Sequence, residues 1–283
     1  MRIAILADIH GNLPALAAVH ADLQRQAPDA VYLAGDQINR CPWNNEVMDL
    51  MRDEGWPAIA GNHEWVVARL GTPENRPPFT NRARFPDLWW TREHLTAAHL
   101  ATIRTLPASR LLAFPGTTPI RLIHGLPDNP FVGILPETPE PEVAAALAGV
   151  AEPVVVCGHT HRPMARRCGR WYVVNGGSVG MPYNGDPRAQ YLLLDWAQGR
   201  WHPTFRQVAY PLSAVTEGFA RYRLEEAWGA LARLYLRTIL TGQPWASDFG
   251  QWMKEQPEQL QQDLDRAVAL YLARHGPDRW AFG

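Results

Sequence analysis

Residues 1–12 are MRIAILADIHGN, and the change inside this stretch from an apolar run to polar residues decides the fold prediction. Arg2 is followed by five apolar residues, which is typical of a strand buried on both faces. Asp8 and His10 come directly after this run. In an extended strand end, residues two apart point the same way, so a carboxylate and an imidazole can hold one cation. By itself an Asp-x-His pair is weak evidence, because it is common by chance.

Further apolar runs along the chain also end at polar residues. Between the early runs, residues 13–24 and 45–52 have the spacing of helices. Alternating strands and helices predict parallel strands covered by helices, whose carboxyl ends meet at one edge of the sheet. We therefore expect the following side chains to share a site: Asp36 after residues 30–34, Asn62 and His63 after 57–60, His124 at the end of 120–124, and His159 and His161 after 154–157.

These residue types together favour a metal site. Each position alone has an ordinary alternative, because a strand-end Asp is often a helix N-cap and a lone His is more often a satisfied polar residue. Five such elements, each just after an apolar strand, are hard to attribute to chance. Mixed carboxylate, amide and imidazole ligands suit Mn²⁺, Fe or Zn²⁺ better than Ca²⁺ or a thiolate-bound metal. The predicted metal ligands are Asp8, His10, Asp36, Asn62, His124, His159 and His161.

The composition restricts the class of protein. With a formal net charge of -1, the 283-residue chain gives no global electrostatic reason for tight nucleic-acid or membrane binding. Three scattered cysteines are too few for a disulfide framework. The first apolar run ends at Asp8 and lacks a cleavage site, and no stretch is long enough to cross a bilayer. We expect a cytoplasmic protein, with homo-oligomerisation left open.

At these residues the sequence resembles the calcineurin-like metallophosphoesterases. The family motifs appear in order as DIH, GDQINR, GNHE, IHG and GHTH. The resemblance is closer to the YfcE-like phosphodiesterase branch of bacteria and archaea, and it runs from residue 1 to about residue 211. It implies an α/β fold in which two mixed β-sheets form a sandwich flanked by helices. Asn39, Cys41 and Gly176 depart from common family residues, but none of them is an expected metal ligand.

The resemblance also implies roles for individual residues. Asp8, His10, Asp36 and His161 hold one metal, and Asp36, Asn62, His124 and His159 hold the other, with Asp36 bridging. His63 protonates the leaving oxygen or stabilises the transition state, and Arg40 either contacts a phosphate oxygen or forms a surface salt bridge. The implied cofactors are two divalent cations, with Mn²⁺ preferred over Fe, Zn²⁺ or Ni²⁺. The implied reaction is hydrolysis of phosphodiester bonds in a small phosphorylated substrate by a metal-bound hydroxide, with monoesters left open.

Other functions stay open at this level. A protein serine/threonine phosphatase and a dinucleoside polyphosphate hydrolase use the same metal chemistry. A non-catalytic scaffold is less favoured, because His63 and every expected ligand are present. We divide the chain into a catalytic domain, residues 1–212, and a helical extension packed on it, residues 213–283. This extension suits packing on the sandwich, a dimer contact or a lid over the pocket.

Overall fold

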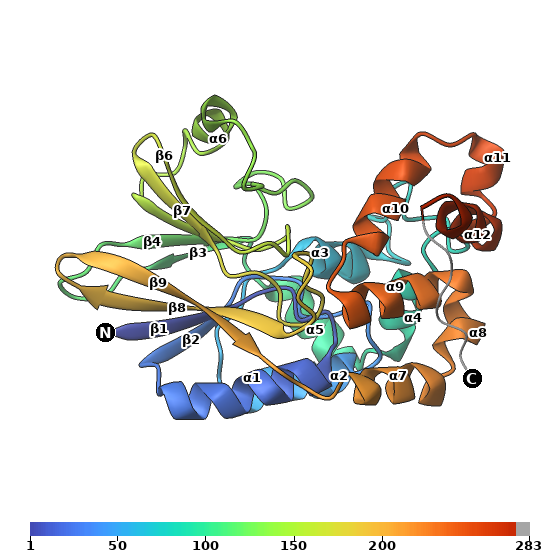
Figure 1. Cartoon of the computed structure of the whole chain (residues 1–283), viewed down its shortest axis with the longest axis horizontal. Coiled ribbons are helices and arrows are strands. Elements are labelled where there is room, and N and C mark those ends of the chain that lie inside the picture. The colour runs from blue at the N-terminus through green and yellow to red at the C-terminus, as the bar shows by residue number, and fades with distance from the viewer. Residues whose placement is uncertain (276–283) are drawn as a thin grey trace.

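Two β-sheets lie face to face in the computed structural model, which describes residues 1–275 (Figure 1). The first sheet has the order β2-β1-β8-β9 and the second β3-β4-β5-β7-β6. Each sheet contains both parallel and antiparallel pairs, so the predicted sandwich of two mixed sheets is confirmed. The strands are β1 (Arg2–Leu6), β2 (Ala30–Leu33), β3 (Ser109–Leu112), β4 (Ile120–Ile123), β5 (Val154–Cys157), β6 (Met164–Cys168), β7 (Trp171–Asn175), β8 (Ala189–Ala197) and β9 (Arg200–Val208).

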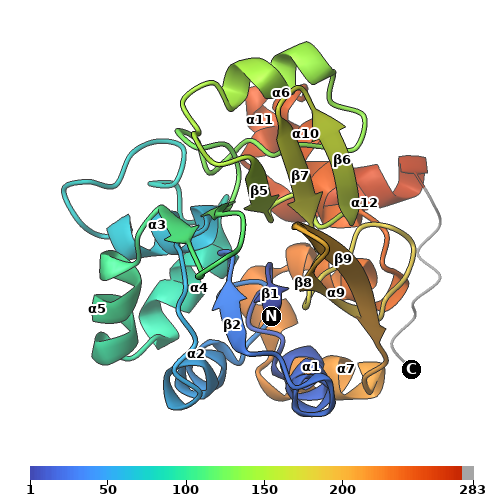
Figure 2. The ribbon, with the colours of Figure 1, turned by 90° about the vertical axis from the view of Figure 1, so that its left-hand side faces the viewer.

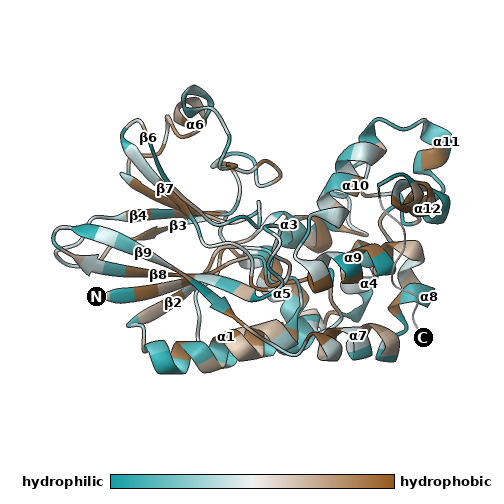
Figure 3. Ribbon diagram, in the orientation of Figure 1, coloured by the Kyte–Doolittle hydropathy of each residue, from teal (hydrophilic) through white to brown (hydrophobic). Residues whose placement is uncertain are grey.

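The alternation of side chains along β1 explains why its sequence is apolar throughout. Ile3 and Ile5 belong to the core between the sheets, whereas Ala4 and Leu6 pack on the opposite face with residues of helix α1 (Leu13–Gln26). Successive side chains of a strand point to opposite faces, so both faces of β1 need apolar residues. Figure 3 shows hydrophobic residues along the strands and polar residues at the β8–β9 turn.

Helices cover both outer faces of the sandwich. Figure 2 shows α1 on one side and α6 on the other, with the strands between them. The helices of the first part of the chain are α1, α2 (Asn44–Asp53), α3 (Asn62–Arg69), α4 (Pro86–His94), α5 (Ala97–Thr105) and α6 (Glu140–Ala146). No helix within residues 1–275 is long and apolar enough to cross a membrane.

The C-terminal region is helical, as predicted. It comprises α7 (Leu212–Arg221), α8 (Leu224–Trp228), α9 (Ala230–Thr241), α10 (Trp245–Lys254), α11 (Glu258–Gln261) and α12 (Leu264–His275). These helices have a core of their own around Trp228, which Cys41 and Met181 from the first part of the chain complete. They lie beyond the carboxyl end of β1 instead of on a sheet face (Figure 1). The boundary at residues 212/213 stays a prediction, and the last part of the predicted extension, residues 276–283, lies outside the described residues.

Several predicted elements have different limits. The sequence predicts one helix over residues 91–106, but the structure has α4 and α5 with a break at Leu95, whose backbone is extended. Thr96 then caps α5 by accepting a hydrogen bond from the His99 N–H at 3.1 Å. The sequence also predicts one helix over residues 217–240. The structure divides it among α7, α8 and α9, because Arg223 and Gly229 adopt positive φ angles of 52° and 61°.

The third predicted strand is also shorter than expected. Residues 57–60 form only an isolated parallel bridge, between Leu33 and Ala58. Asn62 consequently begins α3 instead of following a regular strand. The sequence did not predict the edge strand β6, because its two arginines, Arg166 and Arg167, interrupt the apolar pattern.

Candidate functional site

The predicted ligands other than Asn62, which begins α3, lie at the ends of strands or in the loops that follow them, at one edge of the sandwich. Backbone hydrogen bonds hold these loops in register, from the Asp8 N–H to the Gly35 carbonyl at 3.0 Å and from the Gly158 N–H to the His124 carbonyl at 2.9 Å. Gly35 and Gly61 permit the close approach. A Cβ at Gly35 would lie 2.5 Å from His124 Nδ1, and one at Gly61 would lie 2.1 Å from Asp36 Oδ1. The glycines that precede Asp36 and Asn62 are therefore a steric requirement of the site.

The backbone of these loops is left-handed at the ligand positions, with positive φ at Asp8 (55°), His10 (53°), Asp36 (54°), His159 (68°) and His161 (55°). Such angles are uncommon outside glycine and concentrate at functional sites. Our expectation that Asp8 and His10 share a direction because the strand end is extended is therefore wrong. They converge because each adopts a left-handed turn after β1 has ended.

One group of ligand atoms consists of Asp8, His10 and His161, whose atoms lie within 4.8 Å of one another. His161 Nε2 lies 3.2 Å from His10 Nε2 and 3.4 Å from Asp8 Oδ1. These three residues were assigned to one metal in the sequence, and the structure brings them together.

The second group contains Asp36, His124 and His159, again within 4.8 Å. Asn62 completes it, since its Oδ1 lies 3.1 Å from His124 Nε2 and 2.9 Å from His159 Nδ1. Asp36 Oδ1 accepts the His63 N–H at 2.9 Å. The other oxygen, Oδ2, lies 3.3 Å from His124 Nε2 and 3.8 Å from His10 Nε2. One carboxylate oxygen thus stands between the two groups.

The donor set fits divalent cations. The Nδ1 atoms of His124 and His161 lie 2.8 and 2.5 Å from the carbonyl oxygens of Ala34 and Met181. Because a carbonyl can only accept, each Nδ1 carries the proton, and in the neutral ring each Nε2 presents a lone pair to the centre. His10 Nδ1 is buried without a hydrogen-bond partner among the described residues. Buried lone pairs and carboxylates in such proximity need a positive partner.

The pKa shifts agree with this fit. Burial lowers the pKa of His159 to about 4 and that of His161 to about 3, which keeps both rings neutral and able to ligate. Burial opposes a charge on His124 as well, but the Asp36 carboxylate raises the pKa of this ring to about 10. A proton on His124 therefore occupies the place that a cation would take, and metal binding must release it.

His63 faces the same centre but is held differently. Asn39 Nδ2 lies 2.8 Å from His63 Nδ1 and donates also to Asp87 Oδ2 at 3.0 Å, while its Oδ1 accepts from Thr91 at 2.9 Å. Because the amide nitrogen only donates, His63 Nδ1 is the acceptor, and the neutral ring carries its proton on Nε2. His63 Nε2 lies 3.8 Å from Asp36 Oδ2, and ligand atoms of His63, His10 and Asp36 lie within 4.8 Å of one another. A protonated Nε2 is a donor and not a metal ligand.

Arg40 lies beside this network. Its Nη1 is 3.7 Å from Asp87 Oδ2, and its guanidinium lies 4.3 Å from the centroid of the Tyr235 ring. The Tyr235 hydroxyl donates to the same Asp87 oxygen at 2.9 Å. Arg40 thus pairs with a buried carboxylate and not in a surface salt bridge, and it also lines the cavity next to His63. Its contact with a phosphate oxygen stays a prediction.

Glu64 is a buried residue whose role the sequence did not reveal. Its Oε2 accepts the N–H groups of Asp36 and Gly61 at 2.9 and 2.8 Å. Its Oε1 accepts those of Gln37 and Ile38 at 2.8 and 3.2 Å. Glu64 therefore ties the loop of Asp36 to the start of α3. The GNHE motif could have indicated this, because an acidic residue at the third helical position often caps backbone N–H groups.

Comparisons with known proteins agree with this geometry. The model of the calcineurin-like phosphoesterase superfamily domain matches residues 1–199. An uncharacterised protein of Methanocaldococcus jannaschii is 26% identical over 249 residues, which cover 83% of this chain and 97% of that protein.

Two solved structures are similar over most of the chain. A metallophosphoesterase from Sphaerobacter thermophilus is 27% identical with a TM-score of 0.68, covering 86% of this chain and 100% of that one. A hypothetical protein from Pyrococcus horikoshii, 24% identical, shares the fold with a TM-score of 0.69, covering 81% and 97%. The family is metal-dependent, which fits the donor set described above. The chain belongs to the calcineurin-like phosphoesterase superfamily and is a hydrolase that acts on phosphoric esters.

Proposed function

We propose that the chain hydrolyses phosphodiesters, and monoesters at the same site, with the aid of two divalent cations, of which Mn²⁺ is preferred. The observation that carries this proposal is the position of Asp36 Oδ2 between two groups of ligand atoms, 3.3 Å from His124 Nε2 and 3.8 Å from His10 Nε2. A shared carboxylate oxygen is what a pair of adjacent cations needs. When bound, the cations supply positive charge to the phosphate oxygens and lower the pKa of a water molecule that attacks phosphorus.

His63 stabilises the leaving oxygen in the proposed reaction. A P–O bond forms to the water oxygen, the ester P–O bond breaks, and a proton released by the water neutralises the departing oxygen through solvent, while His63 Nε2–H donates a hydrogen bond to that oxygen. The hydrogen bond from Asn39 to Nδ1 keeps the ring proton on Nε2. Burial lowers the pKa of His63 to about 4, so the ring is neutral near pH 7 and acts as a hydrogen-bond donor.

A substrate panel tests the function. Wild-type protein, freed of metal and then supplied with Mn²⁺, is assayed with bis-aryl phosphodiesters, aryl monoesters, phosphopeptides and dinucleotides. We expect Mn²⁺-dependent hydrolysis that is fastest with diesters. Preference for phosphopeptides or dinucleotides would favour a protein phosphatase or a dinucleoside polyphosphate hydrolase, and inactivity towards every ester would contradict the proposal.

Two variants test the assigned roles. Asp36→Ala removes the shared oxygen, so we expect loss of both bound metal and activity. His63→Ala keeps all seven proposed ligands, so we expect about 10²–10⁴-fold slower turnover with unchanged metal content. His202→Ala, which changes a half-buried histidine of β9 outside the proposed site, is the control. Equal loss of metal in His63→Ala would make His63 a ligand.

A further inference from the structure

A cavity of about 390 Å³ opens beside the proposed phosphate site. Arg40, Asn62 and His63 line it together with residues of α9 and α10. Its volume falls in the range of pockets that hold small organic ligands. Because His63 stands at its border, the cavity begins where the leaving oxygen of a phosphate ester would lie.

The wall nearest α3 is aromatic. The rings of Phe79 and Phe131 stack with centroids 6.0 Å apart, and Phe79 contacts Phe85 with centroids 5.1 Å apart. These residues come from two loops far apart in the chain. The Phe131 side chain is 38% exposed and lines the same cavity as His63. An exposed ring in a cavity wall gains most from contact with another ring or apolar group.

The C-terminal helices form the facing wall. Phe249 and Met253 of α10 and Leu231 of α9 contribute apolar surface. The helices also contact the residues beside His63, because the Tyr235 hydroxyl of α9 donates a hydrogen bond to Asp87 and the Arg40 guanidinium lies over the Tyr235 ring. The sequence left three roles open for the extension. These contacts favour the third, a cover over the pocket, because the helices form one of its walls.

The charged residues of the cavity favour an anion. Three cationic side chains, Arg40, Arg84 and Lys254, line it together with one carboxylate, Asp87. Arg40 lies at the end nearest His63, whereas Lys254 belongs to the last turn of α10. Apolar rings between cations suit an organic phosphate ester with an aromatic group.

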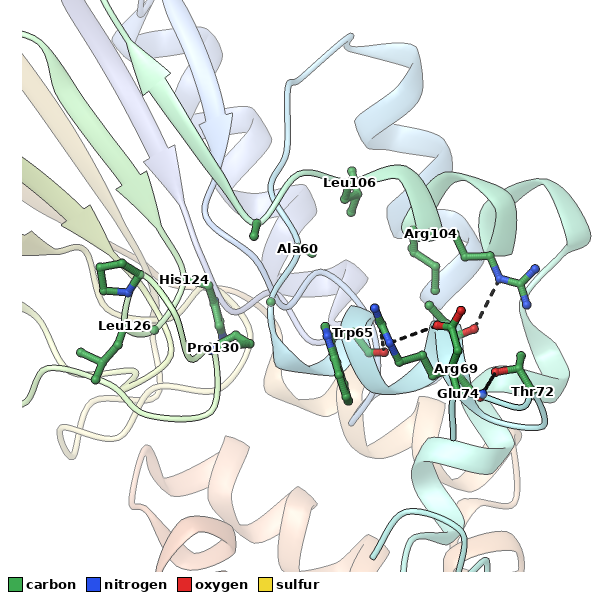
Figure 4. Close-up of a pocket in the computed structure, with 16 residues that line it drawn as sticks. Ala60, Trp65, Arg69, Thr72, Glu74, Arg104, Leu106, His124, Leu126 and Pro130 are labelled. Carbon is green, nitrogen blue, oxygen red and sulfur yellow. Dashed lines mark hydrogen bonds and ion pairs between the residues drawn. The ribbon is translucent and has the colours of Figure 1, made fainter. Parts of the chain in front are cut away.

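Another cavity, of about 700 Å³, borders a different face of α3 (Figure 4). Arg69 of this cavity pairs with Glu74 at 3.4 Å and lies 4.1 Å from the centroid of the Trp65 ring, and Arg104 donates to the Ala68 carbonyl at 3.4 Å. The cavity borders the proposed ligand His124 but includes neither His63 nor Arg40. We therefore place the organic group of the substrate in the cavity that α10 covers.

We infer that this cavity binds the leaving alcohol of the ester and selects alcohols that carry an aromatic ring. The inference rests on the proposed phosphoesterase function and adds the substrate class. The aromatic group could belong to an aryl ester or to a nucleoside, and the two sources share the ring that the phenylalanine wall recognises.

Gly250→Leu provides a test that does not threaten folding. Gly250 lines the cavity on α10, is exposed, and has no atom within 4 Å of the position that its Cβ would take. Leucine is also a better helix former than glycine. The matched control is Gly149→Leu, because Gly149 is exposed, has the same free space and lies outside the cavity.

The main measurement is calorimetric affinity of the Mn²⁺-supplied protein for phenylphosphonate and for methylphosphonate. Burying the ring predicts that wild type prefers the phenyl compound by about tenfold. We expect Gly250→Leu to abolish this preference, Phe131→Ala to reduce it by about threefold, and Gly149→Leu to retain it. A nucleoside monophosphate is titrated in parallel, and tighter binding than phenylphosphonate identifies the ring as a nucleobase.

The outcomes separate the two proposals. If wild type hydrolyses aryl and alkyl esters but binds both phosphonates equally, or if Gly250→Leu keeps the preference, the cavity inference is wrong and the proposed function stands. If wild type hydrolyses no ester, the proposed function fails whatever the phosphonates show.

Discussion

Replacement of Glu64 by glutamine tests whether this side chain holds the catalytic loops together. Each carboxylate oxygen of Glu64 accepts two backbone N–H groups, and the side chain is fully buried. A glutamine amide keeps one oxygen and replaces the other with a nitrogen that cannot accept. Whichever way the amide is oriented, two buried N–H groups lose their acceptor.

The magnitude follows from the number of bonds lost. A buried donor left without a partner costs roughly 1–3 kcal/mol, so two of them predict a loss of about 2–6 kcal/mol. That is a large share of the roughly 5–15 kcal/mol by which a domain is stable. Three of these bonds hold the loop of Asp36, through the N–H groups of Asp36, Gln37 and Ile38, so we also expect weaker metal binding.

The assay is urea unfolding followed by tryptophan fluorescence at pH 8. Burial and the neighbouring Asp36 charge raise the pKa of Glu64 to about 7, and pH 8 keeps the wild-type carboxylate ionised. Glu74→Gln is the control, because Glu74 lies in an exposed loop and pairs only with Arg69 among the contacts of the described residues. If Glu64→Gln lowers the free energy of unfolding by less than about 1 kcal/mol, the reasoning from unpaired donors is refuted.

Three further results are expected. Asp22 is buried, and although burial opposes its ionisation, hydrogen bonds from Tyr191 and Arg206 lower its pKa. A carboxyl group with a lowered pKa stabilises the fold at pH values above its ordinary pKa near 4, and this stabilisation is lost as the pH falls through the pKa of the folded state. Asp22→Asn should therefore lower the free energy of unfolding by roughly 1–3 kcal/mol at pH 7 and by less at pH 3 in unfolding titrations. A Cβ at Gly180 would lie 1.8 Å from the Ile9 carbonyl oxygen, so Gly180→Ala should lower the melting temperature markedly, and an unchanged value would contradict the close approach. Removal of metal by chelation should abolish hydrolysis and lower the melting temperature by mass action, with recovery of both on adding Mn²⁺.

The candidate ligands could be found in the sequence because each follows an apolar run. Such runs predict strands, and the edge where parallel strands end brings their loops together. Asp8, Asp36 and His124 meet for this reason, although their contacts join residues that are far apart in the chain. The apolar character of β1 on both faces likewise indicated a strand between two layers.

The supporting contacts could not be predicted in the same way. Asn39, His63 and Asp87 form one network only because α4 packs beside α3, and the direction of the Asn39 amide determines which nitrogen of His63 carries the proton. The breaks at Leu95 and Arg223 also escaped prediction, since a local backbone angle ends each helix while the apolar spacing continues.

The sequence alone determined which residues the chain has for binding cations and the order in which they follow the strands, because a strand and its periodicity are local properties. The tertiary structure decided how those atoms are shared and oriented, since Asp36 Oδ2 faces both ligand groups only after two sheets have packed together. It also placed the C-terminal helices over the cavity beside His63. The position of a distant helix depends on packing between surfaces, and no local pattern in the chain encodes it.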